Sequence, residues 1–126
     1  MNKNPKITDA EWEVMNVIWE KSPITSNEIV KELKSEMQWQ DSTIYTLINR
    51  LVKKKMIAIE KGSSPYLCSP LVSQQDCRRE ERVSFIRKVY NGSLNLMLAN
   101  MIDEEELTEE DIKELKKILD KKSIRG

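Results

Sequence analysis

The chain has 126 residues, of which 39% are hydrophobic and 33% are charged, with only three glycines and four prolines. The length fits one domain, or a small domain plus an accessory element, and the composition favours a mostly helical protein over a β-sandwich or a disordered chain. We find neither a charged-then-apolar leader nor an apolar run long enough to cross a bilayer, so we expect a cytoplasmic protein without membrane insertion.

Histidine is absent, and the two cysteines, Cys68 and Cys77, form no CxxC pair. The usual zinc sites and the Ser-His or Cys-His nucleophile pairs are therefore excluded. We expect no metal, no cofactor and no enzymatic activity. In a cytoplasmic chain the two cysteines are expected to be reduced rather than joined in a disulfide.

The formal net charge is zero, but the charges are unevenly distributed. Residues 40–90 hold ten Lys and Arg against five Asp and Glu, whereas residues 91–126 hold six against nine. Phosphates are attracted by a local patch, because charges beyond about 8–10 Å are screened at physiological salt. The zero total is therefore compatible with a nucleic-acid partner for the middle of the chain.

Two helix starts near the N-terminus carry the same capping signature. Thr8 is followed three residues later by Glu11, and Thr25 by Glu28. In such a capping box the threonine hydroxyl and the glutamate each accept a hydrogen bond from an otherwise unpaired backbone amide. The two helices are expected over residues 9–21 and 26–37.

A third helix is expected over residues 41–55. Its apolar positions recur at helical spacing and are Ile44, Leu47, Ile48 and Leu51. Two short β-like runs follow, over residues 57–61 and 66–69, separated by a polar turn. Three helices and a hairpin in this order predict a winged helix-turn-helix domain over residues 1–72.

Three further helices are expected in residues 73–126. They cover residues 73–90, 93–101 and 109–122, with Ser93 and Thr108 as N-caps for the last two. Their apolar positions are Val83, Ile86, Val89, Tyr90, Leu94, Met97, Leu98, Met101, Ile112, Leu115, Ile118 and Leu119. A segment of about 50 residues rarely holds a core alone. We therefore expect this helical region to form a homodimer, with Val83, Ile86, Tyr90, Leu94, Met97, Leu98, Ile112, Leu115, Ile118 and Leu119 in the interface.

The third helix also has a polar face opposite its apolar stripe. That face carries Ser42, Tyr45, Thr46, Asn49, Arg50 and Lys53, with Thr43 near the helix start. Arg, Asn and Thr are side chains that read base edges in the major groove. Lys53, Lys54 and Lys55 at the far end are better suited to phosphates, and Lys61 on the wing has the same chemistry. The face contains no acid from Ser42 through Ile59, which favours double-stranded DNA as partner.

Blander interpretations also fit parts of the sequence. A polar helix face that ends in three lysines is often a solvated surface with cations at a helix C-terminus. Trp12 and Trp19 follow the apolar stripe of the first helix and are expected in the core, and Trp39 is expected to anchor the third helix. The acids between Asp103 and Asp111 lack the ordered spacing of a metal site.

Several stretches resemble the penicillinase and methicillin-resistance repressor family. The resemblance is carried by residues 10–19 (AEWEVMNVIW), Trp39, Thr43-Ile44, Thr46-Leu47-Ile48, Arg50-Leu51, Lys53-Lys54, residues 88–92 (KVYNG) and residues 107–110 (LTEE). It implies a homodimeric winged-helix repressor that binds an inverted-repeat operator before resistance genes. Thr43, Thr46 and Arg50 would then read the major groove.

The resemblance also implies how repression ends. In the family, a membrane-bound β-lactam sensor with a zinc protease domain triggers cleavage between Asn and Phe, in the helix before the acidic loop. This sequence has Asn100-Met101 at that place. The CxC…CxC cluster of a copper-responsive branch is absent. Two alternatives stay open: a repressor released by a small ligand or another signal, and a winged helix used for protein contacts.

Overall fold

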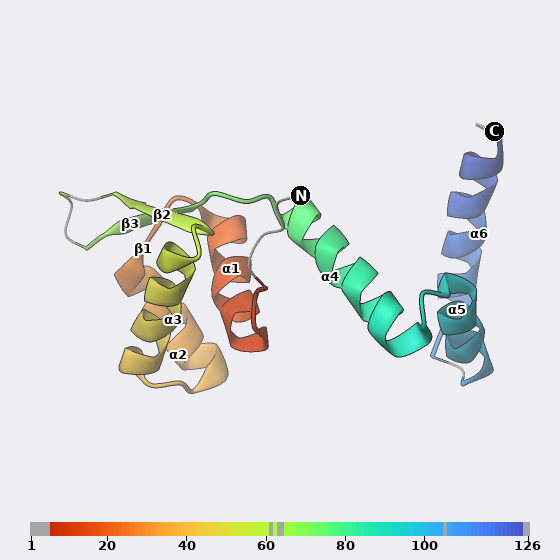
Figure 1. The fold of residues 1–126 in the computed structure, drawn as a ribbon, viewed down its shortest axis with the longest axis horizontal. Helices are drawn as coiled ribbons and strands as arrows, with labels where there is room; N and C mark the ends of the chain where they lie inside the picture. Colours follow the sequence, from red (N-terminus) through yellow and green to blue (C-terminus); the bar gives the residue numbers. More distant parts are fainter. Residues whose placement is uncertain (1–5, 61, 63–64, 105, 125–126) are drawn as a thin grey trace. The chain divides into compact units, whose positions relative to one another are not determined.

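The computed structural model describes residues 6–60, 62, 65–104 and 106–124. The helices are α1 (Asp9–Lys21), α2 (Ser26–Met37), α3 (Asp41–Lys53), α4 (Gln74–Tyr90), α5 (Leu94–Asp103) and α6 (Glu109–Ile124). The strands are β1 (Ile24–Thr25), β2 (Ile57–Glu60) and β3 (Leu67–Pro70). Helices α1–α3 with the small sheet form the expected winged helix, and three more helices follow in the chain (Figure 1).

The chain divides into two compact units, and the boundary along the sequence lies between Cys77 and Arg78. The first unit therefore extends beyond residue 72, where we placed the end of the winged helix. Cys77, in the first turn of α4, is buried and belongs to the core of the first unit. The start of α4 thus packs as part of the winged-helix unit.

The capping predictions at the helix starts are confirmed. At α1, the Thr8 hydroxyl accepts from the Glu11 amide at 3.2 Å, and Glu11 Oε1 accepts from the Thr8 amide at 2.9 Å. Thr25 and Glu28 repeat this reciprocal pair at α2, with 3.2 and 3.1 Å. Thr108 and Asp111 form a reciprocal pair at α6, and the Ser93 hydroxyl accepts from the Leu96 amide at α5. The Ser73 hydroxyl likewise accepts from the Asp76 amide at the start of α4.

Helix α3 ends at Lys53, earlier than the expected Lys55. The Lys55 backbone is left-handed, with φ of 62°. Its amide donates to the Val52 carbonyl at 3.0 Å, and the Met56 amide donates to the Leu51 carbonyl at 3.0 Å. This is the Schellman arrangement that closes helix C-termini, usually with glycine at the left-handed position. Nothing in the sequence indicated this helix end, because a lysine and not a glycine occupies the left-handed position.

The sheet has three antiparallel strands in the order β1-β3-β2, one more strand than the expected hairpin. Strand β1 has only two residues, too few to show an alternating pattern. It pairs Ile24 with Cys68 of β3, and Cys68 also pairs with Ile59 of β2. The sheet lies at one end of helices α1–α3 (Figure 1).

The core of the first unit is filled by apolar residues of α1–α3, including the predicted stripe of α3, together with residues from the sheet. Trp12, Trp19 and Trp39 are half-buried against it, and the Trp19 indole donates to the Val72 carbonyl at 3.0 Å. Cys68 and Cys77 are both buried and form no disulfide. Burial raises the pKa of the Cys68 thiol above its ordinary value of 9.0, which disfavours the reactive thiolate.

The second unit has a different character. Between Arg78 and Ser123, no side chain that the structure describes is buried. Ile86, Tyr90, Met97, Leu98, Ile112 and Leu115 are half-buried, whereas Val83, Leu94, Ile118 and Leu119 are exposed. The apolar positions of α4–α6 therefore find little cover within one chain.

A buried ion pair joins the start of α1 to the end of α3. The Lys54 ammonium donates to Glu11 Oε1 at 2.6 Å and to the Lys6 carbonyl at 2.8 Å. The Glu11 side chain is 1% exposed and the Lys54 side chain 26%. Burial raises the pKa of Glu11, but the hydrogen bonds from Lys54 and Thr8 and the Lys54 charge outweigh it, so the pKa lies below its ordinary value of 4.5.

We expect Lys54→Met to lower the free energy of unfolding by about 2–3 kcal/mol, because Glu11 would remain buried without its counter-charge. This is less than for a fully buried pair because Lys54 is partly exposed. Urea denaturation measures the change. Lys53→Met, an exposed neighbour, is the matched control and should change stability by less than about 0.5 kcal/mol. Equal losses in the two variants would contradict the role of the pair.

The same pair predicts a pH dependence. The folded-state pKa of Glu11 is lower than its unfolded-state value, so its contribution is complete above about pH 4.5 and is lost as the pH falls through the folded-state pKa. The stability difference between the wild type and Glu11→Gln should therefore shrink below pH 4.5. Urea titrations from pH 3 to 7 test this (roughly the range in which carboxylates titrate), with exposed Glu20→Gln as control. If the stability difference between the wild type and Glu11→Gln stayed constant over this pH range, the ion pair would not be the cause of that difference.

Candidate nucleic-acid interface

Helix α3 presents two chemically distinct faces. Ile44, Leu47, Ile48 and Leu51 are buried and hold the helix on α1 and α2. The predicted polar residues are all exposed: Ser42, Thr43, Tyr45, Thr46, Asn49, Arg50 and Lys53. The structure therefore brings these seven side chains together on the solvent side of one helix.

The turn between α2 and α3 sets the direction of this helix. Gln38 is left-handed, with φ of 58°, and its amide donates to the Lys34 carbonyl at 3.1 Å. Trp39 packs against the core as predicted. An exposed ion pair between Lys34 and Asp41, 3.2 Å apart, also links the end of α2 to the start of α3. The start of α3 is thereby held against the rest of the unit.

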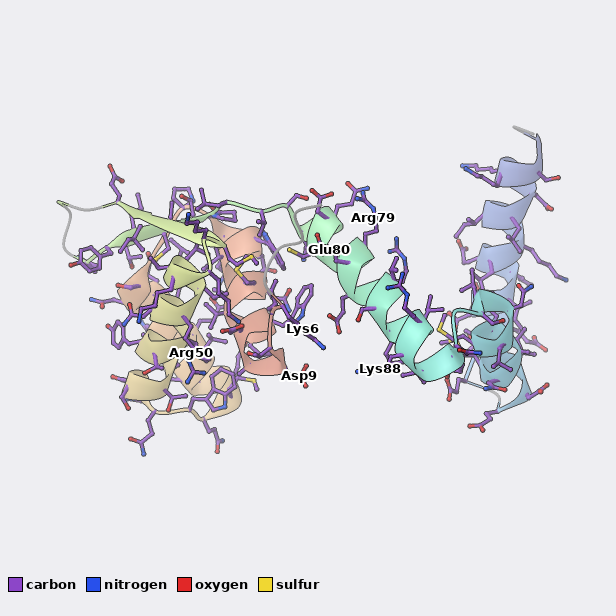
Figure 2. All side chains as sticks on the ribbon, in the orientation of Figure 1. Lys6, Asp9, Arg50, Arg79, Glu80 and Lys88 are labelled. Carbon is purple, nitrogen blue, oxygen red and sulfur yellow. The ribbon has the colours of Figure 1, made fainter. Side chains whose placement is uncertain are left out.

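Two polar side chains of α3 are already engaged within the domain. The Thr46 hydroxyl donates to the Ser42 carbonyl at 2.9 Å, one helical turn earlier. The Tyr45 hydroxyl donates to Asn27 Oδ1 at 2.8 Å and so connects α3 to the first turn of α2. Arg50 makes no ion pair with any described residue, so its guanidinium keeps its donors for another partner (Figure 2).

The placement of Lys54 revises its predicted role. Its ammonium is engaged by Glu11 and by the Lys6 carbonyl at the start of α1, whereas Lys53 is exposed. Lys54 therefore stabilises the domain, and its ammonium is not available as the predicted phosphate contact. Sequence reasoning grouped three consecutive lysines, although residues adjacent in a helix do not share a face. Lys61 lies outside the described residues.

Sequence reasoning missed Asn27. It is exposed in the first turn of α2 and is the partner of Tyr45. With Tyr45, Asn49 and Tyr66 it lines a groove of about 770 Å³ between α2, α3 and the β2–β3 hairpin. A single exposed asparagine is not part of any hydrophobic periodicity, so the sequence pattern does not distinguish it. Only its place at the front of the second helix in a helix-turn-helix order was a usable signal.

The part of the chain that the structure describes lacks two features of other protein classes. No group of three or more Cys, Asp or Glu side chains lies close enough there to hold a metal ion. None of its helices combines the length and apolar character that a membrane span requires.

Comparison with known proteins identifies relatives along nearly the whole chain. The family model described as penicillinase repressor matches residues 7–121. The methicillin resistance regulatory protein MecI of Staphylococcus aureus is 40% identical over 121 residues, which cover 96% of this chain and 98% of that protein. The penicillinase repressor of Bacillus licheniformis is 38% identical over 125 residues, or 99% of this chain and 98% of that protein.

Two solved structures resemble the winged-helix part. The DNA-binding domain of the repressor BlaI matches with a TM-score of 0.55 and 41% identity, over 60% of this chain and 93% of that chain. The monomeric form of Bacillus licheniformis BlaI, in complex with the blaP half-operator, matches with a TM-score of 0.53 at the same identity and coverage.

Proposed function

The chain belongs to the penicillinase repressor family, and we propose that it is a homodimeric transcriptional repressor acting on an inverted-repeat operator of β-lactam resistance genes. The observation that carries the proposal is the exposed polar face of α3, on a fold that resembles BlaI bound to a half-operator. The relatives are named as repressors and regulatory proteins rather than enzymes. We place the protein in the cytoplasm, where its DNA partner lies.

In this proposal α3 enters the major groove, and its side chains have different roles there. Arg50 supplies paired donors suited to guanine, and Asn49 suits adenine. Thr43 lies at the helix start, and Thr46 offers its methyl group because its hydroxyl proton is bound to the Ser42 carbonyl. Exposed Lys53 contacts phosphates, which position the protein without specifying sequence.

The second unit supplies the dimer in this proposal. Its predicted interface residues are half-buried or exposed in the single chain, which is the state expected of a surface that a second copy covers. Large exposed apolar surfaces are uncommon on monomers. A dimer presents two α3 helices to two half-sites, so binding of the second becomes intramolecular.

The proposed switch is cleavage between Asn100 and Met101, triggered by a membrane-bound β-lactam sensor protease. The bond lies near the C-terminal end of α5, where Asn100 is exposed and its carbonyl accepts from the Glu104 amide at 3.0 Å. Helix ends fray more readily than helix centres, so this bond can reach an extended conformation at low cost. Cleavage would separate α6 from the rest of the chain.

The rival functions make different demands on the same residues. A winged helix used for protein contacts leaves the base-reading side chains idle, so operator binding would not depend on Arg50. A repressor released by a small ligand would leave the operator as an intact chain, without cleavage. Selection of bound genomic DNA would identify the operator and its genes directly.

The readout role of Arg50 predicts a sequence-specific loss. Arg50→Ala should weaken operator binding by about 1–3 kcal/mol and leave binding to unrelated DNA nearly unchanged. Lys53→Ala should weaken binding to both and lower the salt slope by about one. Fluorescence anisotropy against both duplexes, at several salt concentrations, separates the two effects. Operator affinity unaffected by Arg50→Ala would favour the protein-contact alternative.

Dimerisation through the second unit leads to a prediction about the cleaved chain. A chain ending at Asn100 should be largely monomeric and bind the operator poorly, because it lacks Ile112, Leu115, Ile118 and Leu119. Sedimentation measures the first property and a gel shift the second. Its winged helix should stay folded, which circular dichroism checks. A tight truncated dimer would exclude loss of dimerisation as the cause of release.

A further inference from the structure

We infer that Asn27 is a phosphate-binding residue, held in position by the Tyr45 hydroxyl, and that the groove beside it takes one sugar–phosphate strand of the operator. The inference rests on the proposed function and extends it to a residue outside α3. Its starting point is the 2.8 Å hydrogen bond between Tyr45 and Asn27.

The hydrogen bond determines how the Asn27 amide is used. Oδ1 accepts the Tyr45 proton, which leaves Nδ2 as the side of the amide that still offers protons. No described residue accepts from Nδ2 or from the Asn27 backbone amide. Asn27 is exposed, so these donors are available to a ligand. Tyr45 thus acts through Asn27 as a positioning residue rather than as a reader of bases.

The groove lies where a DNA strand must pass. It runs between α3 and the β2–β3 hairpin, with Asn49 and Tyr45 on one side and Pro65 and Tyr66 on the other. The major and minor grooves of a duplex are separated by one sugar–phosphate strand. If α3 occupies the major groove, the strand that borders this groove passes along the surface beside α3, where the groove of the protein lies. The groove therefore continues the candidate interface of α3.

The lining also suits this occupant. The lining that the structure describes combines apolar and aromatic side chains with one serine and two asparagines, and none of these residues is charged. Ribose can pack on the aromatic and proline surfaces, while a neutral amide donates to a phosphate oxygen. No carboxylate that could repel the phosphate lies among these described residues. Asn27 would thus contact the phosphate through a neutral hydrogen-bond donor, whereas Lys53 contacts a phosphate through a positive charge.

This distinction provides a test on the full-length protein. Asn27→Ala should weaken binding about tenfold, on operator and unrelated DNA alike, because the lost hydrogen bond goes to a phosphate. The salt slope should stay unchanged, since a neutral donor displaces no counterion, whereas Lys53→Ala lowers it. Asn16→Ala, an exposed asparagine on α1, is the matched control and should bind as the wild type.

A second measurement locates the contact. Operator duplexes carrying a single neutral methylphosphonate should reveal one phosphate per half-site at which the wild type loses about tenfold and Asn27→Ala loses nothing further. Tyr45→Phe should weaken binding about threefold, and only while Asn27 is present. Circular dichroism verifies that each variant is folded.

Three results overturn the inference. They are unchanged affinity of Asn27→Ala, a full methylphosphonate effect that persists in Asn27→Ala, and additive losses for Tyr45→Phe and Asn27→Ala. Failure of the proposed function looks different, because the wild type would then show no preference for any operator and Arg50→Ala would have no effect.

Discussion

The interaction on which the winged helix depends is the buried pair of Glu11 and Lys54. One carboxylate oxygen of Glu11 accepts both the Thr8 amide, which starts α1, and the Lys54 ammonium, which follows the last turn of α3. The other oxygen is buried without a hydrogen-bond partner among the described residues. Because a buried carboxylate is costly unless it is paired, the chain tolerates few alternative arrangements of these two helix ends. This pair fixes the C-terminal end of α3, as the turn after α2 fixes its start, and the two together set the angle at which α3 presents its polar face.

Patterns local to a few residues made much of this fold predictable. Capping boxes located the starts of α1 and α2, and the apolar stripe of α3 identified its buried face. The misses share another origin. Strand β1 exists only through its pairing with β3, in which Ile24 lies opposite Cys68. Lys54 is held away from solvent by Glu11, which is distant in the sequence but 2.6 Å away in the structure. These features can be predicted only when it is known which residues, distant in the sequence, come into contact in the fold.

The same distinction applies to the candidate interface. Membership of the polar face could be predicted because helical spacing alone decides which residues share a side. The role of each residue on that face could not be predicted in the same way. The sequence placed Tyr45 on this face but gave no sign that its hydroxyl donates to Asn27, and it did not show that the Thr46 hydroxyl donates to a carbonyl of its own helix. Spacing assigns a residue to a surface, whereas hydrogen bonding decides which of its atoms remain available.

The contrast between the two units bears on how repression would end. The first unit has a closed core made of its own residues, whereas no described side chain of the second between Arg78 and Ser123 is buried. Under the proposed function, loss of α6 would leave the DNA-reading surface folded and chemically unchanged. What disappears is the second, intramolecular binding event, which sets the effective concentration of one half of the dimer at its half-site. Release would then need no disruption of the winged helix, because each separated half would bind too weakly to compete for the operator.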